Sequence, residues 1–248
     1  MLKIDNVTKK YSNGIIGIEN FNLSMSDSEV VCIAGPNGSG KTTLINCILD
    51  IIPLSSGTIT FDGIQCNKEE YKKNIAYVAD ETILIDSLCG EEYIDFIESM
   101  YGKKNKDKRD SLVELFGMGD ALKQIISTYS HGMKKKLQLI SAFMLESKLV
   151  ILDEPTRGLD VESIVSLKKL MNKYNESGGS ILMSTHNLIA AESFCKRFSI
   201  ISQGHMIAEG TVEELRKKYD AEDMEQVFMK SSVLSERSER IEEIINGM

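Results

Sequence analysis

The residues with the clearest chemical purpose form a glycine-rich stretch, Gly-Pro-Asn-Gly-Ser-Gly-Lys-Thr-Thr, at positions 35–43. An apolar, β-branched run precedes it, and the residues after it, 44–52, have the pattern of a helix. A strand, the pattern GxxxxGKT and a helix in this order predict a loop whose backbone N–H groups surround a phosphate. We expect Lys41 to reach the β- and γ-phosphates of a nucleotide, the Thr42 hydroxyl to bind Mg²⁺, and Thr43 to face the α-phosphate. The other nucleotide-binding candidates in this stretch are Gly35, Pro36, Asn37, Gly38, Ser39 and Gly40.

Two adjacent acids, Asp153 and Glu154, follow the aliphatic run Leu149–Leu152. Mg²⁺ takes one or two carboxylates together with phosphate oxygens, so a carboxylate at the end of a buried strand beside a phosphate loop suits it. We expect Asp153 to hold the metal, directly or through water, and Glu154 to orient and deprotonate the water that attacks the γ-phosphate. An isolated Asp-Glu pair could equally be the charged N-terminus of a helix. The phosphate loop earlier in the chain favours the catalytic interpretation.

Two further side chains are candidates on weaker grounds. His186 follows a third apolar strand, where it could donate a hydrogen bond to the γ-phosphate and sense its presence. Tyr11 ends the first strand, where its ring could stack on an adenine base. By residue type alone, a single histidine is more often packed or merely exposed, and a tyrosine such as Tyr11 is more often a half-buried strand aromatic.

Strands and helices must alternate to position these residues. Such alternation implies a mainly parallel sheet with helices on both faces, and ligands bind such sheets at the carboxyl ends of the strands. Lys41, Asp153, Glu154 and His186 all lie at or just beyond such ends. Expected segments are short antiparallel strands over 2–33 with turns at 12–14 and 26–28, strands at 75–79, 148–152 and 181–185, hairpins at 58–63 and 198–208, a helical pattern over 91–126, a charged loop at 103–109, and helices at 44–52, 131–145, 161–176 and 187–196.

The composition excludes several classes of protein. The formal net charge of −8 argues against a non-specific nucleic-acid binder, which would need a basic face. No apolar run is long enough for a bilayer crossing, and the first residues lack the apolar core of a signal peptide. Five scattered cysteines without CxxC spacing fit reduced thiols better than disulfides or a zinc site. Any role at a membrane must then come through a partner.

Taken together, the motifs resemble the nucleotide-binding subunit of an ATP-binding cassette (ABC) transporter over nearly all of residues 1–230. The resemblance implies an α/β fold: a P-loop NTPase core with a mainly parallel sheet, an N-terminal antiparallel β-subdomain and a helical subdomain over roughly 83–145. It implies an ATPase domain over 1–210 and a C-terminal helical extension over 211–248. The matches are Gly35–Thr42 to Walker A, Leu149–Glu154 to Walker B with its catalytic glutamate, Tyr11 to the adenine-stacking aromatic, Gly158-Leu159-Asp160 to the D-loop, and Ser184-Thr185-His186 to the H-loop.

The chain departs from the family pattern at two motifs. The signature LSGGQ reads Tyr-Ser-His-Gly-Met at 129–133. We expect Ser130 to cap the following helix and, with Gly132, to face the γ-phosphate of ATP held by a second subunit. The lysines at 134–136 would then be the basic start of that helix, near the partner's nucleotide. At the Q-loop position stands Asp80, whose carboxylate can still coordinate Mg²⁺ or its water.

The resemblance implies an ATPase that binds ATP and Mg²⁺, pairs with a second ABC subunit, identical or different, and powers a separate membrane-spanning permease. The Ser-x-Gly-Met core of the signature resembles bacterial exporter cassettes, which favours export of a peptide, antibiotic or lipid. The chain would lie in the cytoplasm, peripheral on the inner face of the cell membrane, with no nucleic-acid partner. Two alternatives stay open: a soluble ABC ATPase that moves no solute, and a nucleotide-gated regulatory or immunity subunit with slow hydrolysis.

Overall fold

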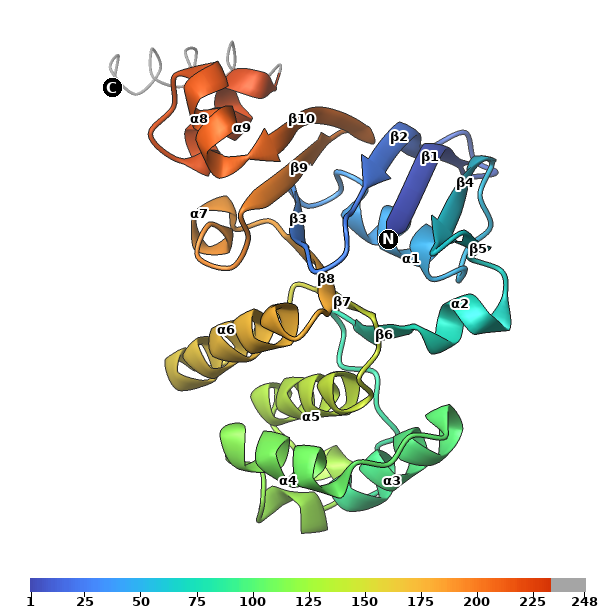
Figure 1. Cartoon of the computed structure of the whole chain (residues 1–248), viewed down its shortest axis with the longest axis vertical. Helices are drawn as coiled ribbons and strands as arrows, with labels where there is room; N and C mark the ends of the chain where they lie inside the picture. The colour runs from blue at the N-terminus through green and yellow to red at the C-terminus, as the bar shows by residue number, and fades with distance from the viewer. Residues whose placement is uncertain (233–248) are drawn as a thin grey trace. The chain divides into compact units, whose positions relative to one another are not determined.

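A computed structural model describes residues 1–232 (Figure 1). The described chain divides into two compact units. Unit 1 consists of Met1–Met25, Val30–Cys66 and the described residues from Ser184 onward. Unit 2 consists of Ser26–Glu29 and Asn67–Met183. The domain boundaries expected from the resemblance stay predictions, and the last part of the expected C-terminal extension lies outside the described residues.

Unit 1 contains an antiparallel sheet with the strand order β2-β1-β4-β5. Alternation of apolar and polar residues buries one face, as in β1, where Leu2 and Ile4 are buried and Ile4 pairs with Ile59 of β4. The expected antiparallel N-terminal strands and the 58–63 hairpin are confirmed. Between the two expected turns lies the single strand β2, whose pairing with β1 shifts register on both sides of the pair Val7 and Phe21. The strands are β1 (Leu2–Lys10), β2 (Ile16–Ser24), β4 (Ser56–Phe61) and β5 (Ile64–Gln65).

The phosphate-loop strand β3 (Val30–Ala34) also belongs to unit 1. It pairs in parallel with β9 (Arg197–Ser202), which pairs antiparallel with β10 (His205–Thr211), so the expected terminal hairpin is confirmed. Helix α1 (Lys41–Ile48) follows β3 and starts earlier than the 44–52 expected, because the glycine turn leads straight into the first helical residue. The other helices of unit 1 are α7 (Leu188–Ala191), α8 (Val212–Tyr219) and α9 (Met224–Ser231).

Helix α7 is much shorter than the helix expected over 187–196. Beyond it, the carboxylate of Glu192 accepts from the Met224 N–H at 2.8 Å and pairs with Arg216. Glu192 therefore joins the segment after α7 to α8 and to the start of α9.

Unit 2 carries the two strands β6 (Ile75–Val78) and β7 (Leu149–Asp153), which pair in parallel with Tyr77 opposite Ile151. The first residues of β8 (Ser180–Thr185) lie beside β7. The helices of unit 2 include α2 (Glu69–Lys73), α3 (Gly90–Tyr101), α4 (Lys106–Leu115), α5 (His131–Met144) and α6 (Val161–Glu176), with short 3-10 turns at Ala121–Lys123 and Ile126–Thr128. Figure 1 shows α3, α4 and α5 gathered in one group of helices.

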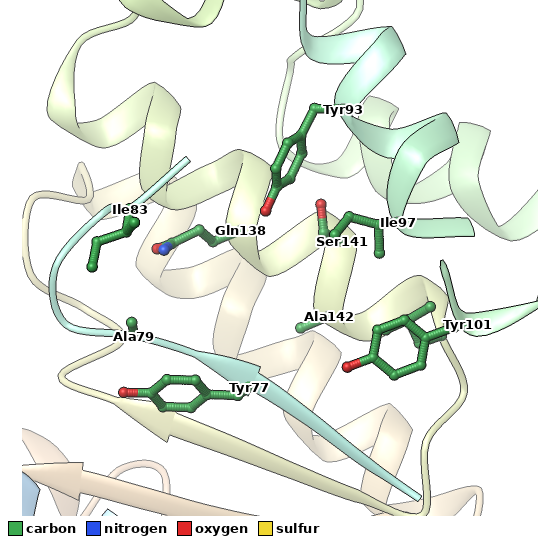
Figure 2. Close-up of a pocket in the computed structure, with 10 residues that line it drawn as sticks. Tyr77, Ala79, Ile83, Tyr93, Ile97, Tyr101, Gln138, Ser141 and Ala142 are labelled. Carbon is green, nitrogen blue, oxygen red and sulfur yellow. The ribbon is translucent and has the colours of Figure 1, made fainter. Parts of the chain in front are cut away.

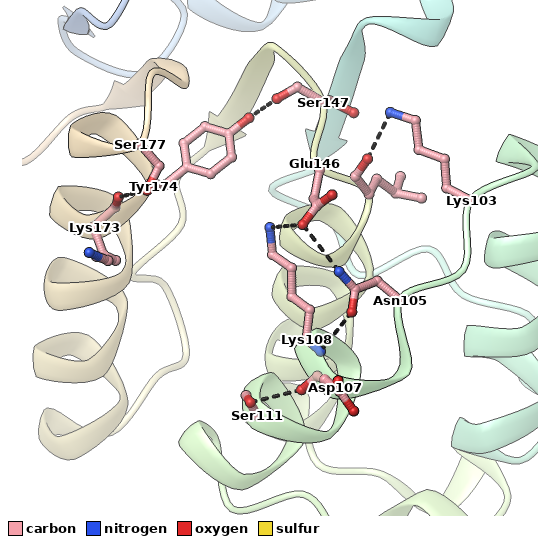
Figure 3. Close-up of polar contacts among 11 residues, drawn as sticks. Lys103, Asn105, Asp107, Lys108, Ser111, Glu146, Ser147, Lys173, Tyr174 and Ser177 are labelled. Carbon is pink, nitrogen blue, oxygen red and sulfur yellow. Dashed lines mark hydrogen bonds and ion pairs between the residues drawn. The ribbon is translucent and has the colours of Figure 1, made fainter.

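The charged stretch 103–109, expected as a solvated loop, is a loop only as far as Asn105. The Asn105 side chain accepts from the Lys108 N–H, which caps α4, so the helix begins at Lys106. Glu146 then accepts hydrogen bonds from Asn105 (3.4 Å) and from Lys108 (3.2 Å), and Lys103 donates to the Leu145 carbonyl (2.8 Å) (Figure 3). The charges of this stretch therefore tie the start of α4 to the residues that follow α5.

Helix α5 supplies much of the core of unit 2, since nearly all of its residues after Lys136 are buried. Phe143 packs edge-on against Tyr174 of α6 with ring centroids 5.3 Å apart, and the Tyr174 hydroxyl donates to the Ser147 carbonyl (Figure 3). All five cysteines are free thiols. Within residues 1–232, no helix has both the length and the apolar character that a bilayer crossing needs.

Candidate active site

The glycine-rich stretch forms a phosphate-sized turn in unit 1. Gly38 (φ +79°) and Gly40 (φ +111°) both adopt left-handed backbone conformations, and Gly40 is the N-cap of α1 without a side-chain cap. The first N–H groups of α1 are therefore left for an anion. The Ser39 hydroxyl oxygen is buried with no hydrogen-bond partner, and Lys41 is only 6% exposed, its ammonium donating to the carbonyls of Gly35 (2.7 Å) and Pro36 (3.1 Å). This cradle fits a nucleotide phosphate.

Segments distant in the sequence brace this loop. The Gly35 N–H donates to the Thr185 carbonyl (3.2 Å), so the residue before His186 is bonded to the first residue of the loop. The Gly204 N–H, in the turn between β9 and β10, donates to the Ser39 carbonyl (2.8 Å). His186 itself is exposed. The strand that precedes His186 is bonded to the phosphate loop, while the role of His186 at the γ-phosphate stays a prediction.

Tyr11 lies beside the loop and is 39% exposed. Its hydroxyl is 3.1 Å from the Thr43 hydroxyl, and the Lys9 ammonium is 5.4 Å from the centroid of its ring. A Cβ on Gly17 would lie 2.9 Å from the Tyr11 ring and 2.7 Å from the Thr43 methyl, so a glycine is needed there. The aromatic predicted to stack on adenine is thus placed next to the residue predicted to face the α-phosphate.

The acidic pair lies in unit 2 at the end of β7. Asp153 is 2% exposed and Glu154 is 7% exposed. Glu154 has a left-handed backbone (φ +47°), and its carbonyl accepts from the Arg157 N–H at 3.2 Å, which closes a tight turn. A non-glycine residue held in this conformation marks a position that its surroundings over-determine, as is common at active sites.

Buried groups near these acids respond to their charge. Burial raises the pKa of Tyr77, and the negative charges of Asp153 and Asp80 raise it further. Burial lowers the pKa of Lys135, while Asp80, Asp153 and Glu154 oppose that shift. Asp80 and Asp153 therefore lie close enough to act on both groups, and Glu154 lies close enough to act on Lys135. Of the three lysines predicted as the basic start of α5, Lys135 is completely buried. Their predicted place near a partner's nucleotide stays a prediction.

Asp80 is held by an ion pair. Its Oδ2 atom is 2.8 Å from the Arg157 guanidinium, while Oδ1 is buried without a hydrogen-bond partner. One carboxylate oxygen thus stays available as the metal ligand predicted at this position, and that role stays a prediction. Within residues 1–232, no cluster of three or more His, Cys, Asp or Glu side chains could hold a metal ion. A bound Mg²⁺ would need few protein ligands, with phosphate oxygens supplying others, as the predicted pair Thr42 and Asp153 implies.

The variant signature forms the start of α5. The Ser130 hydroxyl accepts from the Met133 N–H at 3.2 Å, which confirms the predicted N-cap. A Cβ on Gly132 would lie 2.7 Å from the Gly158 carbonyl oxygen, and a Cβ on Gly158 would overlap the His131 ring. The histidine that replaces the first signature glycine therefore packs directly on the glycine of the D-loop segment.

This packing predicts a paired requirement for His131 and Gly158. Gly158→Ala should lower ATPase activity at least about fivefold, since a left-handed alanine is strained and its methyl displaces the His131 ring. Adding His131→Gly should recover part of the loss, because the overlap is removed while the strain remains. Gly117→Ala is the matched control, with a left-handed φ of +62° but no atom within 4 Å of its Cβ. Steady-state ATP hydrolysis measures all four proteins; no recovery in the double variant would contradict the contact.

The predicted site residues thus fall into two groups. Unit 1 holds Tyr11, the 35–43 loop and His186, and contacts link the loop to Tyr11 and to the residue before His186. Unit 2 holds Asp80, Ser130, Gly132, Asp153 and Glu154. Four contact residues were missed by the sequence reasoning: Gly17, Lys135, Arg157 and Gly158 in its contact with His131. For Lys135, helical spacing could have indicated burial, because this residue lies three positions before Gln138 and seven before Ala142 on the buried face of α5.

Comparison with known proteins places this geometry in a family. The family model described as "ABC transporter" matches residues 18–157. The linearmycin resistance ATP-binding protein LnrL of Bacillus subtilis (strain 168) is 34% identical over 220 residues, which cover 87% of this chain and 70% of that protein. The lantibiotic transport ATP-binding protein SrtF of Streptococcus pyogenes is 29% identical over 238 residues, covering 96% of this chain and 100% of that protein.

Solved structures agree. An ATP-binding subunit of an ABC transporter superposes with a TM-score of 0.88 at 28% identity, covering 93% of this chain and 99% of that one. The ATP-binding cassette MJ0796, in a dimeric post-hydrolysis state bound to ADP and phosphate, gives a TM-score of 0.76 at 26% identity, covering 85% and 98%. The predicted α/β fold is therefore confirmed. The chain belongs to the ABC transporter family and is an ATP-binding, ATP-hydrolysing subunit of it.

Proposed function

We propose that this ATPase dimerises around two ATP molecules and powers a separate membrane-spanning permease that exports a peptide, an antibiotic or a lipid. The observation that supports a permease partner is an apolar, tyrosine-rich groove in unit 2 (Figure 2). Export as the direction of transport is supported by two relatives, one named for linearmycin resistance and one for lantibiotic transport. With this partner, the chain would be peripheral on the inner face of the membrane.

In the proposed reaction, the 35–43 loop binds the phosphates through its N–H groups and Lys41. The ammonium of Lys41 exchanges its two carbonyl acceptors for phosphate oxygens, so the loop is already shaped before ATP binds. Glu154 accepts a proton from the attacking water, and its buried, fixed backbone restricts where that water can stand. His186 donates to the γ-phosphate. Mg²⁺, held by Thr42 and Asp153, would neutralise charge that develops on the phosphate oxygens.

Dimer formation rests on the N-terminus of α5. This helix of 14 residues is capped by Ser130 and has no acidic residue in its first turn, so its positive end suits a phosphate. We propose that this end contacts the γ-phosphate of ATP held by a second copy or by another ABC subunit. Pairing itself is supported by the similar cassette MJ0796, whose solved structure is dimeric. Hydrolysis then removes the group that joins the two chains, and the dimer opens.

The groove has the chemistry of a helix-binding surface. It encloses about 270 Å³, and Tyr77, Tyr93 and Tyr101 line it together with the 76%-exposed Ile83. Figure 2 shows side chains from the end of β6, from α3 and from α5 directed toward this space. The Gln138 side-chain oxygen is buried without a partner, so it can accept one more hydrogen bond. An amphipathic cytoplasmic helix of a permease, with an apolar face and one donor, fits this groove.

The test is affinity purification of the tagged chain from gently solubilised native membranes, with partners identified by mass. A polytopic membrane protein in stoichiometric amount is the expected result, and its sequence would identify the class of solute. Ile83→Asp should strip that protein from the complex at an unchanged melting temperature, whereas Ile189→Asp, at a 51%-exposed position outside the groove, should retain it. Ribosomal or DNA-repair proteins would instead support a soluble ABC ATPase, and slow turnover without a permease would support a regulatory subunit.

A further inference from the structure

The loop after β6 is held by side chains of α5. The Lys135 ammonium donates to the carbonyls of Ala79 (2.6 Å) and Asp80 (3.1 Å), and the Gln138 amide donates to the Glu81 carbonyl (3.2 Å). Three successive carbonyls thus point at one helix face. Because Lys135 is fully buried and both acceptors are backbone atoms, the lysine fixes the backbone of Asp80 and leaves the Asp80 carboxylate for another partner.

That partner is Arg157, at 2.8 Å from Oδ2 of Asp80. The side chain of Arg157 is 63% exposed and that of Asp80 is 29% exposed. Ion pairs this exposed typically contribute only about 0–1 kcal/mol to folding, because solvent screens the charges and ordering the side chains has an entropic cost. The ion pair therefore contributes little to the free energy of folding. Its effect lies instead in the segments that it holds in position.

Arg157 closes the turn that carries the catalytic glutamate. It lies three residues after Glu154 and donates its backbone N–H to the Glu154 carbonyl (3.2 Å). Glu154 is held at a φ of +47°, a conformation that a neighbouring constraint must maintain. Arg157 therefore contacts Asp80 through its side chain and the Glu154 turn through its backbone, so one residue links the two.

We propose that Arg157 is a positioning residue for ATP hydrolysis: its ion pair with Asp80, whose backbone Lys135 fixes, holds the Glu154 turn in the geometry that activates water. Asp80, which stands where the family pattern has a glutamine, is thus connected to the turn through Arg157. The proposal concerns the ATPase step alone and holds whichever solute or permease the subunit serves.

The test is steady-state ATP hydrolysis by purified Arg157→Met, Asp80→Asn and the double variant, each with its melting temperature. Each single variant should lower kcat about tenfold while the KM for ATP changes less than about twofold, because the turn rather than the phosphate loop is disturbed. The double variant should be no slower than the worse single one, since both changes break the same pair. The charge-swapped protein Asp80→Arg with Arg157→Asp should recover part of kcat. Melting temperatures should stay within about 4 °C of the original.

The matched control is the ion pair of Lys108 and Glu146 (Figure 3), which has similar exposure (29% and 56%) and joins α4 to the segment after α5. Lys108→Met should leave kcat unchanged. Wild-type kcat in Arg157→Met would overturn the proposal, as would multiplicative losses in the double variant or a melting temperature that falls in step with kcat. If Asp80→Asn alone lowers kcat and raises the Mg²⁺ requirement, Asp80 acts as a metal ligand and Arg157 has no positioning role. Absence of hydrolysis in the unmodified protein would instead contradict the ATPase assignment.

Discussion

Replacing Glu154 with glutamine should abolish ATP turnover and trap the chain as an ATP-bound dimer. Glutamine keeps the size of the side chain but cannot accept the proton of the attacking water, and loss of such a base typically lowers rates by about 10²–10⁴. Glu154 is 7% exposed, so bulk water does not readily replace its carboxylate as the proton acceptor. ATP should still bind, because the loop and Lys41 lie in a different unit and are unaltered.

The measurement is the molecular mass in solution with ATP and Mg²⁺. Glu154→Gln should elute as a dimer with ATP and as a monomer with ADP, while the unmodified protein returns to monomer as it hydrolyses ATP. Adding Lys41→Ala should prevent the dimer, because its ammonium no longer holds the phosphates. Glu146→Gln is the control for a glutamate outside the site. A monomeric Glu154→Gln protein that nonetheless binds ATP would show that ATP does not join two copies.

Much of the fold follows from local patterns. Period-two alternation and turn residues located the strands of the N-terminal sheet and the 198–208 hairpin, and helix α6 (Val161–Glu176) lies where its periodicity predicted it. Errors came where tertiary contacts decide. Lysine-rich residues looked like a solvated loop, but Asn105 and Glu146 turn most of them into the start of α4. Helix α7 is likewise shorter than its pattern predicted, and the contacts of Glu192 with distant segments are not encoded in any local pattern.

The site shows the same division. Spacing located the phosphate loop, the acidic pair and the N-cap Ser130, because each depends on neighbours along the chain. The Asp80–Arg157 pair and the contact of His131 with Gly158 join residues from separate segments, so residue type alone does not indicate them. Residue type also gives no sign that Lys135 is buried, because a lysine is rarely fully buried; the carbonyls of the loop after β6 explain its position.

A final expectation separates two reasons for a glycine in the phosphate loop. Gly40→Ala should destabilise the fold as well as weaken ATP binding. A Cβ there would overlap the Gly17 carbonyl oxygen and lie 2.8 Å from the Ile18 Cδ1 atom, and φ is +111°. The overlap is with backbone of β2, which cannot swing aside as a flexible side chain would. Left-handed strain of roughly 1–2 kcal/mol and about 1–3 kcal/mol of overpacking should therefore add.

The comparison is with Gly63→Ala, where φ is +78° and no atom lies within 4 Å of the Cβ, so only the strain applies. At roughly 2–4 °C per kcal/mol for a protein of this size, Gly40→Ala should melt at least about 2 °C below Gly63→Ala when no nucleotide is present. Equal melting temperatures would mean that the glycine serves the phosphate alone. A clear gap without nucleotide would mean that the loop is shaped first by its packing on β2, and that the conformation which receives ATP is built into the folded chain.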